Sequence, residues 1–233
     1  MQDSEYPIDE KEVLRYLGFQ GRPADRATLR RVEEMTALCR ETARPVFRYV
    51  FFPVAVGPEG AKLGETDTVL RGRDIARHLR GAVRCALMAV TLGAETDRRQ
   101  LLLEQKSMAD AVVFDAVCTA MIESAADNCE ERLRRAVSAE GYFLNGRYSP
   151  GYGDFSMTQQ GEVLGLLDAG RRLGITLTEG FLMLPRKSVS AALGIFRELP
   201  ESEARGCGVC SMRETCRVRK EGGNCGKEFI SPD

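Results

Sequence analysis

The segment SMADAVVFDAVCTAMIESAADNCEERLRRAVSAE, residues 107–140, has the longest uninterrupted hydrophobic period in the chain. Its apolar residues recur at steps of three and four, the spacing that places them on one face of an α-helix. They are Val112, Val113, Ala116, Val117, Ala120, Met121, Ala125, Leu133 and Val137. Gly141 follows, and glycine is common just past a helix C-terminus. The segment therefore predicts one long helix with a single buried face.

Shorter helices are predicted on both sides of this segment from their N-terminal signals. Asp9-x-x-Glu12 and Ser156-x-x-Gln159 match the capping box, in which the first and fourth side chains bond to each other's backbone amides. The predicted helices begin at Asp9, Asp25, Asp74, Thr96 and Ser156, and they end near Tyr16 for the first, at Gln105 for the fourth and near Gly174 for the last.

Strands are predicted where β-branched and aromatic residues cluster between turn signals. Residues 45–56 and 85–92 fit this pattern, and residues 175–184 form a third candidate that Pro185 ends. Residues 189–196 fit a strand or a short helix, and we favour the strand. Long helices mixed with a few strands indicate an α+β fold, with helices packed around a small mixed or antiparallel sheet.

Two regions differ in composition, which predicts a domain over residues 1–200 and a cysteine-rich tail over residues 201–233. The net charge is −1, with no basic excess of the kind expected for a nucleic-acid-binding protein. No apolar run reaches the roughly 20 residues that span a bilayer. The acidic N-terminus is not followed by the apolar region of a secretory signal. We therefore expect a cytoplasmic protein that contacts neither nucleic acid nor membrane.

His78 is the single histidine of the chain. One histidine rules out an H-E-x-x-H zinc site or any other two-histidine site. No G-x-S-x-G elbow accompanies it, so a Ser-His-Asp triad has no support. His78 is expected to be a partly exposed residue on a helix.

The stretch RYSPGYGD, residues 147–154, has the chemistry of a ligand-binding loop. Arg147 offers a planar fork that matches a carboxylate. Pro150 stiffens the backbone, and Gly151 permits the positive φ that lets a ligand approach it closely. Tyr152 could lie over a cation or a flat base. S-adenosylmethionine (AdoMet) combines these three groups, whereas the alternative is a Pro/Gly turn with an exposed arginine.

Three segments resemble the activation domain of cobalamin-dependent methionine synthase, in its short stand-alone form. R-x-x-P-G-Y at residues 147–152 resembles the AdoMet-binding signature of that family. LTEGFLMLPRKSVS at residues 177–190 resembles its L-T-E-S-x-x-M-x-P-x-x-S-V-S segment, and ADNCEERL at residues 126–133 resembles the acidic helix before the loop. One departure is Leu193, which stands near the place of a family tyrosine.

The resemblance implies roles for seven residues. Arg147 would hold the AdoMet carboxylate. The backbone of Ser149, Pro150 and Gly151 would bond to the ligand, and Tyr152 would pack beside it. Asp127 would take the α-ammonium group, with Glu130 as the second candidate. Ser188 and Ser190 equally fit the polar face of a strand, and Arg186 and Lys187 could guide an anionic group of the corrinoid.

The resemblance also implies an activity in which AdoMet and one electron reactivate cob(II)alamin. The chain lacks the D-x-H-x-x-G cobalamin motif, so we expect cobalamin in trans, on a methionine synthase core or another corrinoid protein. A flavodoxin-type protein is the expected reductant. Whether the chain is catalytic by itself stays open. The alternative function is a non-catalytic redox module that passes electrons to a corrinoid enzyme through its cysteine cluster.

That cluster comprises four thiols within nineteen residues, at Cys207, Cys210, Cys216 and Cys225. In a cytoplasmic chain, clustered thiols favour a metal over disulfides. Four thiolates suit either zinc or a [4Fe–4S] cluster, and a metal-free tail is the third possibility. The other cysteines, Cys39, Cys85, Cys118 and Cys129, lie in apolar segments and are predicted to be core residues.

Overall fold

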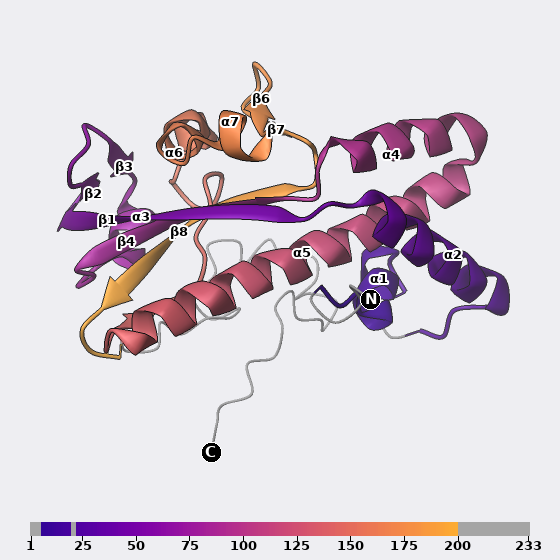
Figure 1. Ribbon diagram of the computed structural model, residues 1–233, viewed down its shortest axis with the longest axis horizontal. Helices are drawn as coiled ribbons and strands as arrows, with labels where there is room; N and C mark the ends of the chain where they lie inside the picture. Colours follow the sequence, from indigo (N-terminus) through magenta and orange to yellow (C-terminus); the bar gives the residue numbers. More distant parts are fainter. Residues whose placement is uncertain (1–5, 20–21, 200–233) are drawn as a thin grey trace. The chain divides into compact units, whose positions relative to one another are not determined.

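A six-stranded antiparallel sheet forms the centre of the computed structural model, which describes residues 6–19 and 22–199 (Figure 1). The strands are β1 (Val46–Gly57), β2 (Gly60–Leu63), β3 (Val69–Arg71), β4 (Arg84–Thr91), β5 (Phe143–Leu144) and β8 (Ser188–Phe196). Their order across the sheet is β3-β2-β1-β4-β8-β5. A separate two-stranded hairpin joins β6 (Thr176–Leu177) to β7 (Met183–Leu184).

The central strand β4 is buried on both faces of the sheet. Ala86, Met88 and Val90 belong to the core on one side, and Cys85, Leu87 and Ala89 belong to the core on the other. The alternation follows from the two-residue period of a strand. The predominantly apolar run at residues 85–92 was therefore a correct sign of a buried strand.

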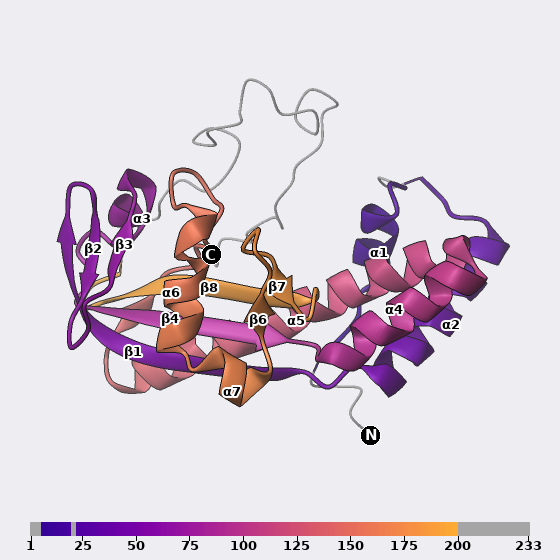
Figure 2. The same ribbon diagram turned by 90° about the horizontal axis from the view of Figure 1, so that it is seen from above.

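Helices cover both faces of this sheet (Figures 1 and 2). The helices are α1 (Glu10–Tyr16), α2 (Arg26–Thr42), α3 (Arg73–His78), α4 (Ala94–Lys106), α5 (Met108–Ala139), α6 (Gln160–Leu166) and α7 (Ala169–Leu173), with a 3₁₀ turn at Met157–Gln159. Helices α1, α2 and α5 share one core with the sheet, and α3, α6 and α7 share the other. The α+β prediction, with helices around a small antiparallel sheet, is confirmed.

Helix α5 is the predicted long helix and has 32 residues, which corresponds to about 48 Å. Ser107 caps it by accepting a hydrogen bond from the amide of Asp110 at 3.3 Å. Gly141 has φ +79°, the left-handed conformation expected after a helix. The apolar face of α5 packs against the sheet, and polar residues of α5 lie along the edge of that face.

The predicted helix from Ser156 to Gly174 is wrong as a single element. Ser156 caps the first turn through the amide of Thr158. Gln159 does not complete the capping box; instead its amide pairs with both backbone groups of Arg71 on β3, at 2.6 and 2.7 Å. The helix is then interrupted at Asp168, which has φ +49°. The local pattern predicted that Gln159 would cap the helix, but its side chain bonds to Arg71, which is distant in sequence.

The predicted strand over residues 175–184 is also wrong as one element, because a turn divides it into β6 and β7. In that turn Phe181 has φ +61° and its amide donates to the carbonyl of Thr178 at 3.0 Å. The helix predicted from Asp74 begins one residue earlier, at Arg73. The predictions for the tail, with Cys207, Cys210, Cys216 and Cys225, fall outside the described residues.

Candidate functional site

The loop from Arg147 to Phe155 is fixed to the sheet and closed on itself. Tyr148 exchanges two backbone hydrogen bonds with Ala192 on β8, at 3.0 and 2.9 Å. Gly151 has φ +98°, and its amide donates to the carbonyl of Phe155 at 2.7 Å. A side chain at Gly151 would be strained at this φ. The loop is therefore a defined turn.

Asp154 connects this loop to α3. Its carboxylate accepts from the backbone amides of Arg73 and Asp74, both at 2.9 Å. These bonds stabilise the charged carboxylate and lower the pKa of Asp154. The residue before the helix, Gly72, has no side chain to act as a cap, so a residue of the loop takes that role.

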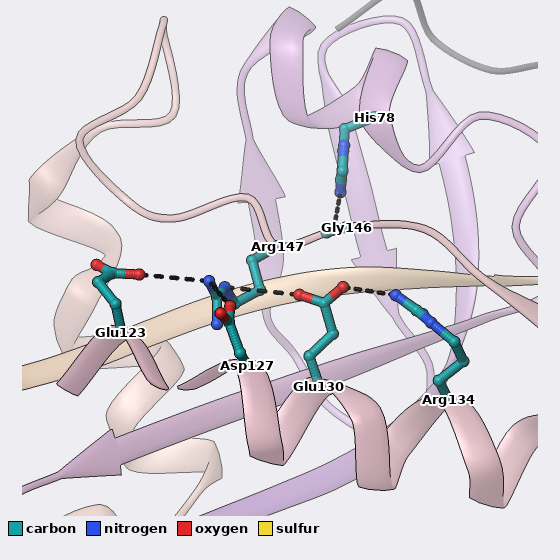
Figure 3. Close-up of polar contacts among 7 residues, drawn as sticks. All are labelled: His78, Glu123, Asp127, Glu130, Arg134, Gly146 and Arg147. Carbon is teal, nitrogen blue, oxygen red and sulfur yellow. Dashed lines mark hydrogen bonds and ion pairs between the residues drawn. The ribbon is translucent and has the colours of Figure 1, made fainter. Parts of the chain in front are cut away.

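Arg147 lies against three carboxylates of α5 (Figure 3). Its Nη2 is 2.9 Å from Oδ1 of Asp127 and 3.4 Å from Oε2 of Glu123, and its Nε is 3.6 Å from Oε2 of Glu130. Residues three and four apart share one side of a helix. We call Glu123, Asp127 and Glu130 the acidic face of α5.

One nitrogen of the Arg147 guanidinium makes no hydrogen bond to the residues that the structure describes. Its Nη1 is buried and has no hydrogen-bond partner there, although the side chain as a whole is 19% exposed. Arg134 also contacts Glu130, at 2.6 Å, and its Nη1 is likewise buried and unpaired. Three carboxylates thus face two guanidinium groups in this cluster.

The aromatic rings of the loop contact one another. Tyr148 contacts Tyr152 and Phe155, with ring centroids 6.1 and 6.4 Å apart. Phe155 is fully buried, whereas Tyr152 is 64% exposed. Tyr152 therefore presents an exposed aromatic side chain on the same loop as Arg147.

The structure brings together Arg147, Asp127 and Glu130 of the predicted site, and it places Ser149, Pro150, Gly151 and Tyr152 on the adjoining loop. The alternative of an exposed arginine in a simple turn does not fit, because Arg147 is mostly buried among carboxylates. Glu123 was missed. Its position four residues before Asp127, on the same side of the predicted helix, was the signal that could have found it.

The expectation for His78 is wrong. Its side chain is only 7% exposed, and Nε2 lies 2.9 Å from the carbonyl oxygen of Gly146. The apolar neighbours Ile75 and Leu79 are also buried, so α3 turns this side of the helix towards the sheet.

Lys187 and the two serines take part in internal contacts. Nζ of Lys187 lies 2.9 Å from Asp115 and 2.8 Å from Thr119, both on α5. Ser188 donates to Thr91, and Ser190 accepts from the side chain of Gln160. These contacts favour the interpretation of the serines as polar positions on a strand, and they connect Lys187 to the long helix.

A cavity of about 880 Å³ lies elsewhere, between the β1–β2 hairpin, β3 and residues 154–159. Arg147 and the acidic face of α5 are not among its lining residues. We place the candidate site at Arg147 because a buried, unpaired donor held among carboxylates specifies a ligand chemically, whereas the volume of an open groove does not.

Neither a metal cluster nor a membrane span occurs within the described ranges. No group of three or more His, Cys, Asp or Glu residues there could hold a metal ion. None of the helices in this part of the chain is long and apolar enough to cross a bilayer. Cys39, Cys85, Cys118 and Cys129 are free and buried, as predicted.

The fold and the site together describe an α+β domain with an arginine-centred polar cluster beside a glycine-containing loop. The family described as "Vitamin B12 dependent methionine synthase, activation domain" matches residues 75–212, more than half of the 233-residue chain. The chain belongs to this family, which confirms the resemblance seen in its motifs.

A solved structure has the same fold. The crystal structure of the MetH reactivation domain bound to AdoHcy aligns with a TM-score of 0.64 and 17% sequence identity, over 94% of this chain and 82% of that one. No curated protein sequence gives a significant match.

Proposed function

We propose that this chain binds AdoMet at Arg147 and supplies its methyl group for the reductive methylation of cob(II)alamin on a separate methionine synthase core or other corrinoid protein. Arg147 carries the proposal, because its guanidinium is held by the acidic face of α5 while Nη1 remains unpaired. Membership of the activation-domain family supports the ligand, as does the AdoHcy bound to the similar domain.

The charges of AdoMet match those of the cluster. Its α-carboxylate would bind Nη1 of Arg147, in the charge-assisted geometry that arginine favours. Its α-ammonium would bind Asp127, with Glu123 or Glu130 as neighbours. AdoMet has one net positive charge because of its sulfonium, which suits a site lined by carboxylates.

The loop would bind the rest of the ligand. The amide of Gly151 already donates within the turn, so we assign ligand contacts to the other backbone groups of Ser149, Pro150 and Gly151. Tyr152, exposed beside Tyr148, would pack against the adenine or the sulfonium. Contact of a cation with the tyrosine ring would contribute on the order of 0.5–2 kcal/mol.

The protein's part in the reaction is to orient the methyl group. The sulfur–methyl bond breaks, a cobalt–carbon bond forms, and AdoHcy leaves as a neutral thioether. One electron comes from a reductant, which we propose to be of the flavodoxin type. The 233 residues contain no D-x-H-x-x-G motif, which supports a corrinoid supplied by a partner.

Calorimetric titration with AdoMet tests the binding half of this proposal. Arg147→Ala should weaken binding by roughly ten- to hundredfold, as expected for the loss of a charged hydrogen bond. Arg135→Ala is the matched control, because Arg135 also lies on α5 but is 78% exposed and pairs with Glu131 on the helix surface. Failure of the native protein to bind AdoMet, or equal binding by Arg147→Ala, would refute the proposed site.

Methyl transfer tests the partner half. The protein, radiolabelled AdoMet and a one-electron reductant are incubated with a corrinoid protein in its cob(II)alamin form, and label on the corrinoid is measured. Arg147→Ala should abolish most of the transfer. Tight AdoMet binding without transfer to any corrinoid protein would leave the site intact but disprove the role.

The tail cysteines are a separate proposal. We propose that Cys207, Cys210, Cys216 and Cys225 bind one metal centre, either zinc or a [4Fe–4S] cluster. Iron, sulfide and zinc analysis after anaerobic purification distinguishes the two. Free thiols without metal would disprove both.

A further inference from the structure

His78 contacts the chain immediately before Arg147. Its Nε2 is 2.9 Å from the carbonyl oxygen of Gly146 (Figure 3). A carbonyl oxygen only accepts hydrogen bonds, so Nε2 must carry the proton. A neutral His78 is then the Nε2–H tautomer, and its bond fixes the peptide group that leads into Arg147.

The same imidazole also contacts the residue immediately after Arg147. Its ring and that of Tyr148 are stacked, with centroids 5.0 Å apart and planes 29° apart. Both residues are well anchored elsewhere, since Tyr148 pairs with Ala192 on β8 and His78 is buried in α3. One side chain thus touches both neighbours of the arginine.

Asn145 completes this arrangement from the other side. Its Nδ2 donates to the carbonyl of His78 at 2.8 Å, and its Oδ1 accepts from the amide of Gly194 at 2.7 Å. Residues 145–148 are therefore held between α3 and β8. A guanidinium lies several bonds from its Cα, so a small rotation of the backbone here would move it by a large part of a hydrogen-bond length.

We infer that His78 is a positioning residue, which orients the backbone of Arg147 so that the guanidinium meets the acidic face of α5 and turns Nη1 to the ligand. The inference rests on the proposed AdoMet site. The family assignment does not supply it, because it comes from the contacts of this one imidazole.

The single histidine allows a direct test of the geometry that needs no ligand. Imidazole nitrogen NMR on uniformly ¹⁵N-labelled protein reports one ring, so the signals require no assignment. The expected spectrum at neutral pH is that of the Nε2–H tautomer with a slowly exchanging proton. An Nδ1–H tautomer, or an Nε2 proton that exchanges as fast as in a free imidazole, would overturn the inference.

Two variants test the effect on binding. His78→Phe keeps a flat ring beside Tyr148 but has no donor, and it should weaken AdoMet binding about tenfold. His78→Gln keeps an N–H donor and should stay within about threefold of the native affinity. A residue that only filled the core would lower thermal stability in both variants without separating their affinities.

Thr96→Val is the matched control. Thr96 is buried on α4 and donates to the carbonyl of Gly93 at 2.7 Å, so the change removes the same kind of bond away from Arg147. It should lower stability and leave AdoMet affinity unchanged.

Native affinity for AdoMet in His78→Phe would overturn the inference, and so would a loss of affinity in His78→Gln as large as that in His78→Phe. If His78→Phe does not fold, His78→Gln and the NMR spectrum decide. Absence of AdoMet binding by the native protein would instead disprove the proposed function, and the NMR result would still test the geometry.

Discussion

Asp154 and Asp74 each hold the backbone amide of the other. Asp154 accepts from the amide of Asp74 at 2.9 Å, and Asp74 accepts from the amide of Asp154 at 3.3 Å. The two residues are 80 positions apart, so this pair connects the loop that carries Arg147 to the start of α3. His78 lies at the end of that short helix, and both of its ends therefore contact the same loop.

Replacement of Asp154 by Asn should make the protein less stable at neutral pH and should remove part of its acid sensitivity. Backbone amides lower the pKa of Asp154 in the folded protein, whereas the unfolded value is about 3.9. The stabilisation is therefore complete above the unfolded pKa and is lost as the pH falls through the folded one. Melting temperatures of both proteins from pH 3 to pH 7 measure this.

The control for that experiment is Asp67→Asn, because the carboxylate of Asp67 is fully exposed and only 3.9 Å from Lys62. If the difference in melting temperature between the native protein and Asp154→Asn stays constant from pH 7 to pH 3, the lowered pKa of Asp154 is not the cause of the acid sensitivity.

Gln159→Ala should weaken the edge of the sheet at β3. The side chain of Gln159 bonds to both the amide and the carbonyl of Arg71, as a neighbouring strand would. Its loss should cost about 2 kcal/mol of unfolding free energy and speed exchange of the Arg71 amide. Urea denaturation and hydrogen exchange give the two values. Thr158→Ala, an exposed neighbour, should change neither, and unchanged protection of Arg71 in Gln159→Ala would show that the pairing contributes nothing.

Glu123→Gln should weaken AdoMet binding without disturbing the fold. Glu123 is 44% exposed and 3.4 Å from Arg147, so its contribution is screened by water and the expected loss is three- to tenfold at most, from about 1 kcal/mol. The gap between the native and variant affinities should narrow as salt is added. Glu131→Gln serves as control, since Glu131 pairs with Arg135 instead. Equal affinities at low salt would exclude Glu123 from the site.

The core cysteines should resist alkylation in the folded protein. Burial raises the pKa of Cys85 and of Cys129 to about 12. A hydrogen bond with Cys39, 3.4 Å away, and burial raise the pKa of Cys118. At pH 8 the reactive thiolate of Cys85 is then only roughly 10⁻⁴ of the total. Iodoacetamide labelling followed by peptide mass spectrometry should find these sites unmodified until denaturant is added, and rapid labelling of Cys85 in folded protein would contradict the prediction.

The large elements could be predicted because their patterns depend on nearby residues. Residues 107–140 predicted the long helix and Gly141 its end, since an apolar stripe and a terminal glycine are local properties. Asp9 and Asp25 cap α1 and α2, as predicted, through Lys11 and Thr28. The run at residues 85–92 indicated a buried strand, and β4 lies there.

The failures have a common physical cause, which is a partner distant in sequence. Gln159 matched a capping box, yet its side chain pairs with β3. Asp74 matched a helix start, yet the cap comes from Asp154. The apolar neighbours Ile75 and Leu79 marked the buried side of α3, but the contact of His78 with Gly146 depends on how α3 packs on the loop. At the site, the sequence motif identified Arg147, whereas the helical spacing in α5 was needed to show that Glu123 also faces Arg147.

The three carboxylates around Arg147 have a thermodynamic consequence. A free arginine side chain samples many rotamers, and the entropy lost on fixing it corresponds to about 2 kcal/mol. Here helix α5 has immobilised that side chain before any anion arrives. Under the proposed function, binding of a carboxylate to this guanidinium should therefore carry little further entropic cost from ordering the arginine side chain.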